Sequence, residues 1–118
     1  MFGFKLALSG STLFLGGTDT SQYTGSIEYH NVATSAGAWL ATGAKSVVGG
    51  SNPNTNIGTI IDSGTALIYG PPNAVASFYA AIPGSFAVNR GFYVYPCDSL
   101  PPVGFSWGGK TWEISAEK

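Results

Sequence analysis

The chain has 118 residues, enough for one domain that buries roughly two-thirds of its unfolded surface. Charged residues make up only 9% of it and glycine occurs 17 times, which is typical of a β-rich protein with tight turns and excludes a disordered tail. The formal net charge is -1 with neither sign clustered, so we expect no nucleic-acid partner and no attachment to anionic membranes.

The first part of the chain predicts short strands joined by tight turns. Apolar residues alternate over residues 2–8, and after a Ser-Gly turn residues 11–15 return as the second arm of a hairpin. Asp19 ends the turn-like stretch Gly16-Gly17-Thr18-Asp19 and is interpreted as a turn carboxylate. Residues 26–32 are predicted to form a further strand carrying His30, the single histidine, and a lone histidine does not make a zinc site.

The middle of the chain predicts two strands, a loop and an apolar stretch around one acid. Residues 37–42 and 45–48 are interpreted as strands, and the polar, turn-rich residues 49–56 as an exposed loop. In residues 59–70 a single ionisable side chain, Asp62, lies between two apolar runs of the kind that marks strands buried on both faces.

The position of Asp62 favours one of two interpretations. A carboxylate between buried strands must lose water, which is costly unless the group is hydrogen-bonded or paired. Asp62 is therefore either the first residue of a tight Asp-Ser-Gly turn or a chemically active group. These residues alone leave both interpretations open.

After Gly70 the apolar period changes from that of a strand to that of a helix. Prolines in the first turn and Pro83-Gly84 at the end predict one substantial helix over about residues 72–82. Strands return at residues 91–95 and 103–107, and a Gly-Gly pair predicts a two-residue hairpin turn after the second. The apolar stripe of the helix, interpreted as core packing, consists of Val75, Phe78, Tyr79 and Ile82.

The stretch Ile-Ile-Asp-Ser-Gly-Thr-Ala around Asp62 resembles the active-site signature of the aspartic endopeptidases. The flanking segments resemble, in the same order, those around the second catalytic aspartate of pepsin-like proteases, above all the secreted fungal members related to polyporopepsin. The resemblance implies a mostly β fold and a single domain over residues 1–118, most of a C-terminal lobe and incomplete at its C-terminal end. The flanking segments are Phe4-Lys5-Leu6, Leu13 to Asp19, Tyr23 to Ile27, Trp39, Leu67 to Pro72, Phe78-Tyr79 and Ile82-Pro83-Gly84.

The resemblance also implies a chemistry without metal or cofactor, in which two carboxyl groups share one proton and activate water against a peptide bond. Asp62 would be one of these catalytic groups, and Ser63 would lock the two halves of the site together at their base. The main chain of Gly64 would approach carboxylate and substrate, and Thr65 would bind the outer oxygen of Asp62. Gly64, Thr65 and Ala66 would contact the peptide, although Ala66 stands where Ser or Thr is commoner.

A second Asp-Thr/Ser-Gly motif is absent, because Asp19 and Asp98 are followed by other patterns. We therefore expect the second catalytic aspartate on an N-terminal lobe missing from this chain, and no activity of the chain alone. The resemblance implies secretion, although Met1-Phe2-Gly3-Phe4 does not read as a signal peptide and no apolar run approaches the roughly 20 residues that span a bilayer. By the same resemblance Cys97 would pair with a later cysteine that this chain lacks, which leaves its thiol reactive.

Two alternatives to a two-lobed protease are kept. A retroviral-type protease also works with one such motif per chain, as a symmetric homodimer, but the late apolar-apolar-Gly-Arg segment of that type is absent. The chain could also be a non-catalytic β-domain that binds peptide or carbohydrate. Trp107 and Trp112 would then form a stacking platform, although they more simply cover one face of a sheet.

Overall fold

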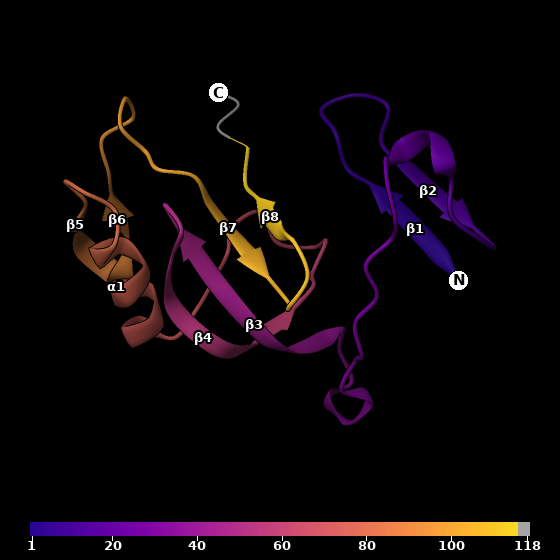
Figure 1. Cartoon of the computed structure of the whole chain (residues 1–118), viewed down its shortest axis with the longest axis horizontal. Coiled ribbons are helices and arrows are strands. Elements are labelled where there is room, and N and C mark those ends of the chain that lie inside the picture. The colour runs from indigo at the N-terminus through magenta and orange to yellow at the C-terminus, as the bar shows by residue number, and fades with distance from the viewer. Residues whose placement is uncertain (116–118) are drawn as a thin grey trace.

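The structure is a computed structural model that describes residues 1–115. Within them it contains antiparallel strands, short 3₁₀ turns and one α-helix (Figure 1). The strands and the helix are β1 (Phe2–Lys5), β2 (Thr12–Leu15), β3 (Leu40–Val48), β4 (Ser51–Ile60), α1 (Pro72–Ala80), β5 (Phe86–Ala87), β6 (Tyr93–Val94), β7 (Val103–Ser106) and β8 (Thr111–Glu113). The 3₁₀ turns are η1 (Thr20–Gln22), η2 (Thr34–Ala36) and η3 (Asn89–Gly91).

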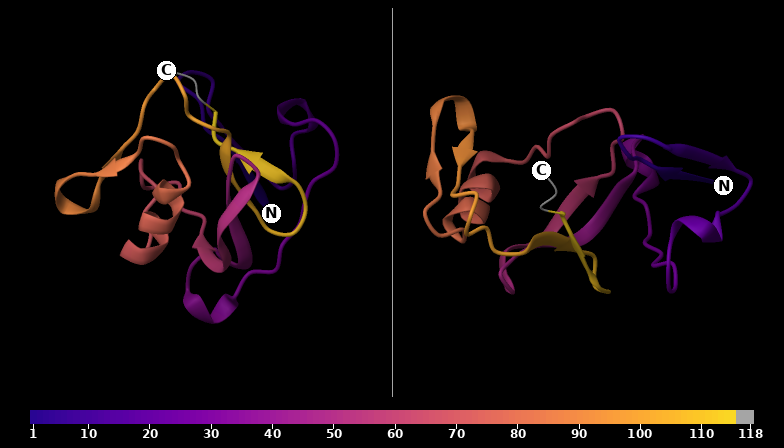
Figure 2. Two further views of the ribbon diagram at one scale, coloured as in Figure 1. Left: turned by 60° about the vertical axis from the view of Figure 1, so that its left-hand side comes forward. Right: turned by 90° about the horizontal axis from the view of Figure 1, so that it is seen from above.

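A four-stranded antiparallel sheet forms the centre of the molecule, with the strands in the order β4-β3-β7-β8. The helix α1 and the small β5–β6 hairpin lie at one end of this sheet, and the β1–β2 hairpin lies at the other (Figures 1 and 2). The order places β4 at an edge of the sheet. This edge leads into the loop that carries Asp62.

The core lies where α1 and the segment after it meet the central sheet. Val48 of β3, Ile82 and Val103 of β7 are buried against one another, with Phe78 and Tyr79 packed around them. The predicted helix is confirmed, since α1 ends within two residues of the predicted end, and Phe78, Tyr79 and Ile82 of the stripe pack in this core as predicted. Apolar burial of this kind is the main stabilising term of a small domain.

A buried polar link fixes the helix to the sheet. The Asn54 side-chain amide on β4 donates to Ser46 Oγ at 3.1 Å and to the Ala74 carbonyl oxygen at 3.0 Å. Ser46 is almost completely buried on β3, where an unpaired hydroxyl is costly. The Asn54 side chain therefore gives the buried Ser46 hydroxyl a hydrogen-bond partner and also attaches α1 to the sheet.

Truncating the core should cost far more stability than truncating the surface. Ile82→Ala removes buried apolar volume between α1 and the sheet, and we expect it to lower the free energy of unfolding by about 2–5 kcal/mol. The matched control, Leu8→Ala, removes a fully exposed side chain and should change it by less than about 0.5 kcal/mol. Urea denaturation of both variants measures the difference, and equal losses would contradict this account of the core.

Several predicted element boundaries are wrong. Residues 26–32 form no strand, and only Val32 makes an isolated bridge, to Ala41. The two strands predicted over residues 37–48 are one strand, β3, whose register against β4 shifts repeatedly. One of these shifts spans Thr42 and Gly43, the polar and glycine positions at which the sequence pattern of a strand is interrupted.

The predicted loop over residues 49–56 is instead a turn followed by most of β4. Gly49 and Gly50 have φ of 54° and 85°, and Val48 pairs with Ser51 across them. A two-residue turn with both residues in the left-handed region joins adjacent strands tightly, which shortens the connection. The polar residues after it are tolerated in a strand because β4 lies at the sheet edge.

The hairpins agree with prediction in place but not in length. The strands β1 and β2 are shorter than the predicted arms, with six residues between them. Strand β6 covers only two of residues 91–95. In the β7–β8 hairpin Ser106 pairs with Thr111, so the loop has the four residues 107–110 instead of two.

The described residues enclose little of their own apolar surface. The Cα radius of gyration is 15.7 Å, whereas a compact domain of this length has about 13.5 Å. Large apolar side chains are exposed on the β1–β2 hairpin, around Trp39 and along the loop after β4. Exposed apolar side chains that gather in patches are typical of interaction surfaces. Of the helices in the described part of the chain, none is long and apolar enough to cross a bilayer.

Candidate active site

The loop that carries Asp62, residues 61–71, runs from the end of β4 to the start of α1. At its first end Ile60 pairs with Leu40, and the Ile61 amide donates to the Trp39 carbonyl oxygen at 3.0 Å. At its second end the Pro71 carbonyl accepts from the Val75 amide as α1 begins. Both ends of the loop are therefore fixed to regular structure.

Both carboxylate oxygens of Asp62 accept hydrogen bonds from the residues that follow. The Gly64 amide donates to Oδ1 at 2.8 Å and the Thr65 hydroxyl donates to Oδ2 at 3.4 Å. A Cβ on residue 64 would lie 3.1 Å from Oδ1, a tight contact that explains glycine at this position. The turn that these bonds close sets the direction of the carboxylate.

The other predicted site residues lie on the same loop. Ser63 and Ala66 are exposed, and the Ser63 hydroxyl makes no hydrogen bond to another residue in the described range. The structure thus brings Asp62, Gly64 and Thr65 together, and Ser63 takes no part in these contacts. The catalytic and substrate-binding roles of these residues stay predictions.

The prediction that Asp62 lies between buried strands is wrong for this chain. Residues 61–70 are all exposed, with Ile61 at 58% and Ile68 at 69%, and the apolar run after Asp62 forms no strand. The physical reason is the sheet order, because β4 is an edge strand and no strand of the described residues pairs with its outer side. Two hollows on the described surface, one beside the β1–β2 hairpin and one beside residues 100–103 and 113–115, are lined by other segments.

Asp19 is a turn carboxylate, as predicted. Its Oδ1 accepts from the Ser21 hydroxyl at 2.7 Å and from the Ser21 amide at 3.0 Å, which caps η1. These hydrogen bonds, with a smaller contribution from Lys5, hold the pKa of Asp19 below its ordinary value. No hydrogen bond or ion pair joins Asp62 to another titratable side chain among residues 1–115.

The structure also describes the single cysteine and the side chains that could bind a metal ion. Cys97 is a free, exposed cysteine. No cluster of three or more His, Cys, Asp or Glu side chains suited to a metal ion lies within the described residues.

The model of the eukaryotic aspartyl protease family matches residues 1–118, the whole chain. The chain belongs to the eukaryotic aspartyl protease family. This confirms the predicted family, and the mostly β architecture with one main helix confirms the predicted fold class.

Several relatives of this aspartyl protease chain have been named. It is 39% identical over 122 residues to an aspartic protease of Phaffia rhodozyma, covering 97% of this chain and 30% of that protein. It is 39% identical over 116 residues to cathepsin D of Bos taurus, covering 94% of this chain and 29% of that protein. It is 38% identical over 99 residues to endothiapepsin of Cryphonectria parasitica, covering 82% of this chain and 23% of that protein. The chain thus spans less than a third of the length of these relatives.

Proposed function

We propose that this chain is the part of an aspartic endopeptidase that carries one of its two catalytic carboxyl groups, that of Asp62. The observation that supports this most is the geometry of Asp62 in a chain of this family. Each of its oxygens accepts one hydrogen bond, from Gly64 and from Thr65, which orients the group and leaves room for a further partner at both oxygens.

The proposed chemistry needs a second carboxyl group close to Asp62. Two carboxyl groups about 3 Å apart cannot both ionise cheaply, so they share one proton. The ionised group takes a proton from water while the protonated group donates one to the carbonyl oxygen of the peptide. The pair titrates jointly, and we expect activity in the acid range.

The second carboxyl group would come from outside these 118 residues, on an N-terminal lobe of the complete protease. Ser63 would then lie at the base of the two catalytic loops, and Gly64, Thr65 and Ala66 would contact a peptide or protein substrate. The exposed apolar side chains around Asp62 support such a covering lobe, which would also remove water from the carboxylate. The apolar side chains concerned are Ile60, Ile61, Leu67, Ile68 and Tyr69.

We extend the proposal to the setting of the enzyme. Named relatives include fungal aspartic proteases, and we propose secretion by a fungal cell and action on protein substrates. Neither nucleic acid nor a membrane takes part in this proposal.

A chimeric protease tests the proposed function. Residues 1–118 replace the matching 30% of the Phaffia rhodozyma aspartic protease, and peptide cleavage is measured at acid pH. Circular dichroism and thermal melting establish that the chimera is folded. We expect a folded chimera to cleave peptide, whereas a folded chimera without activity would contradict the proposal.

A further inference from the structure

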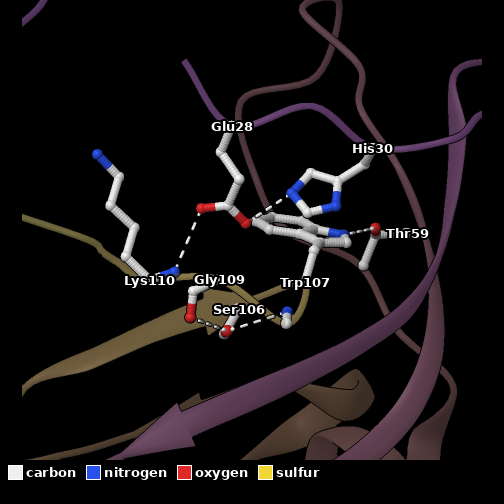
Figure 3. A network of polar contacts seen from close by, with 8 residues as sticks. Glu28, His30, Thr59, Ser106, Trp107, Gly109 and Lys110 are labelled. Carbon is white, nitrogen blue, oxygen red and sulfur yellow. Dashed lines mark hydrogen bonds and ion pairs between the residues drawn. The ribbon is translucent and has the colours of Figure 1, made fainter. Parts of the chain in front are cut away.

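The tip of the β7–β8 hairpin, residues 107–110, reaches the strand that leads into the Asp62 loop (Figure 3). The Trp107 indole N–H donates to Thr59 Oγ1 at 2.8 Å, across 48 positions of sequence. The Thr59 hydroxyl in turn donates to the Ala41 carbonyl oxygen on β3 at 3.3 Å. Thr59 precedes Asp62 by three residues, so this contact fixes the end of β4 from which the Asp62 loop begins.

The Trp107 ring also contacts the segment that carries Glu28 and His30. His30 lies against it with 6.0 Å between ring centroids, and Figure 3 shows the imidazole next to the indole. His30 Nε2 lies 2.6 Å from Glu28 Oε1, and the other oxygen of Glu28 accepts from the Lys110 amide at 3.2 Å. Glu28 thus joins His30 to the same hairpin tip that carries Trp107.

The hairpin tip is shaped to receive the Glu28 carboxylate. Gly108 has φ of 105°, a conformation that favours glycine, but Gly109 has no such requirement. A Cβ on residue 109 would overlap the Glu28 carboxyl group, so the second glycine serves this approach. Glycine therefore occurs at the two positions for different reasons: the backbone conformation at residue 108 and the close approach of Glu28 at residue 109.

The surroundings of Glu28 favour the charged form of its carboxyl group. Partial burial raises its pKa, but the hydrogen bonds from His30 and from the Lys110 amide outweigh this and hold the pKa below its ordinary value. An ionised carboxylate accepts hydrogen bonds at both oxygens and so can bridge the two segments. The titratable side chain beside it is His30 on its own segment, whereas Lys110 contributes its backbone amide and holds its ammonium group over the Trp112 ring.

We propose that Trp107 is a positioning residue for the Asp62 loop. Glu28 and His30 hold the Trp107 ring in place, and its indole N–H fixes the position of the Thr59 hydroxyl. The end of β4, from which the loop departs, is thereby fixed as well. This rests on the proposed function in one respect, that Asp62 is the catalytic group being positioned. A tryptophan that only fills space would need its ring but not its N–H.

The first arm of the test uses the 118-residue chain and amide resonances in ¹H–¹⁵N spectra. Trp107→Phe keeps an aromatic ring without the donor, and Thr59→Val removes the acceptor. Both should shift the Asp62 and Gly64 amide resonances, and the double variant should add little to either change. Thr59→Ser keeps the hydroxyl and should restore the original positions.

The matched control is Thr55→Val, on the same strand, where the hydroxyl is exposed and makes no hydrogen bond to a described residue. It should leave the Asp62 and Gly64 resonances in place. Unchanged resonances in Thr59→Val, or equal shifts in Thr55→Val, would overturn the proposal even if Trp107→Phe fails to fold.

The second arm measures kinetics in the chimera. Misplacing a catalytic group by about 1 Å costs up to about 10²-fold in rate, so Trp107→Phe and Thr59→Val should lower kcat with KM little changed, and Thr59→Ser should recover it. A fall that appears only in KM would contradict a positioning role. If Asp62→Asn leaves the chimera active, the proposed function fails, while the resonance shifts still decide whether Trp107 positions the loop.

Discussion

The 118-residue chain alone is expected to cleave no peptide at acid pH. One carboxyl group cannot both accept the proton of water and donate one to the substrate carbonyl at the same moment, and Asp62 makes no contact with a second acid in the described structure. Pepstatin-type inhibitors should bind only weakly, since much of the proposed cleft lies outside the chain. Peptide cleavage assays and inhibitor titration at acid pH measure both expectations.

The homodimeric alternative predicts the opposite outcome for the same preparation. Two copies of this chain would bring two Asp62 side chains together at a twofold axis. Acid proteolysis abolished by Asp62→Asn, together with a sedimentation mass of twice the monomer, would support that reading against ours. A folded preparation without cleavage, whatever its mass, would exclude it.

In the chimera, Asp62→Asn is expected to reduce kcat/KM by about 10²–10⁴-fold. Asparagine keeps the size and can accept from Gly64 and Thr65 only through a single oxygen, but it cannot exchange a proton with water. The loss should therefore appear chiefly in kcat. Initial rates over a range of substrate concentrations separate the two parameters.

Asp98→Asn is the matched control for this prediction. Asp98 is also followed by serine and is exposed, but leucine replaces the glycine that follows Ser63 in the Asp62 loop. The control should keep the activity of the chimera within a few-fold. Equal losses from both substitutions would show that the effect comes from general disturbance of the fold and not from the role of Asp62.

The sequence predicted the helix and most hairpins because these depend on local patterns. The stripe of Val75, Phe78, Tyr79 and Ile82 has the helical period, and Pro83-Gly84 marks its end. The apolar runs beside Asp62 were interpreted as buried strands because runs of this kind occur in sheet centres. Their exposure follows from β4 being an edge strand, and no local pattern reports the order of strands in a sheet.

The candidate site was predictable only as a motif. The spacing of Asp62, Gly64 and Thr65 indicated the turn that the hydrogen bonds close. The Trp107–Thr59 contact was missed, since 48 positions separate its partners. The Gly-Gly pair was a visible signal for a turn, but the reason for Gly109 is the carboxylate of Glu28, which lies far away in sequence.

The most direct test of this account is a crystal structure of the chimera at acid pH, in which the distance from the Asp62 carboxyl group to the nearest other carboxyl group is measured. We predict a second aspartate about 3 Å away, with the Gly64 and Thr65 hydrogen bonds retained. An Asp62 that faces open solvent, with no other carboxyl group within hydrogen-bonding distance, would contradict it.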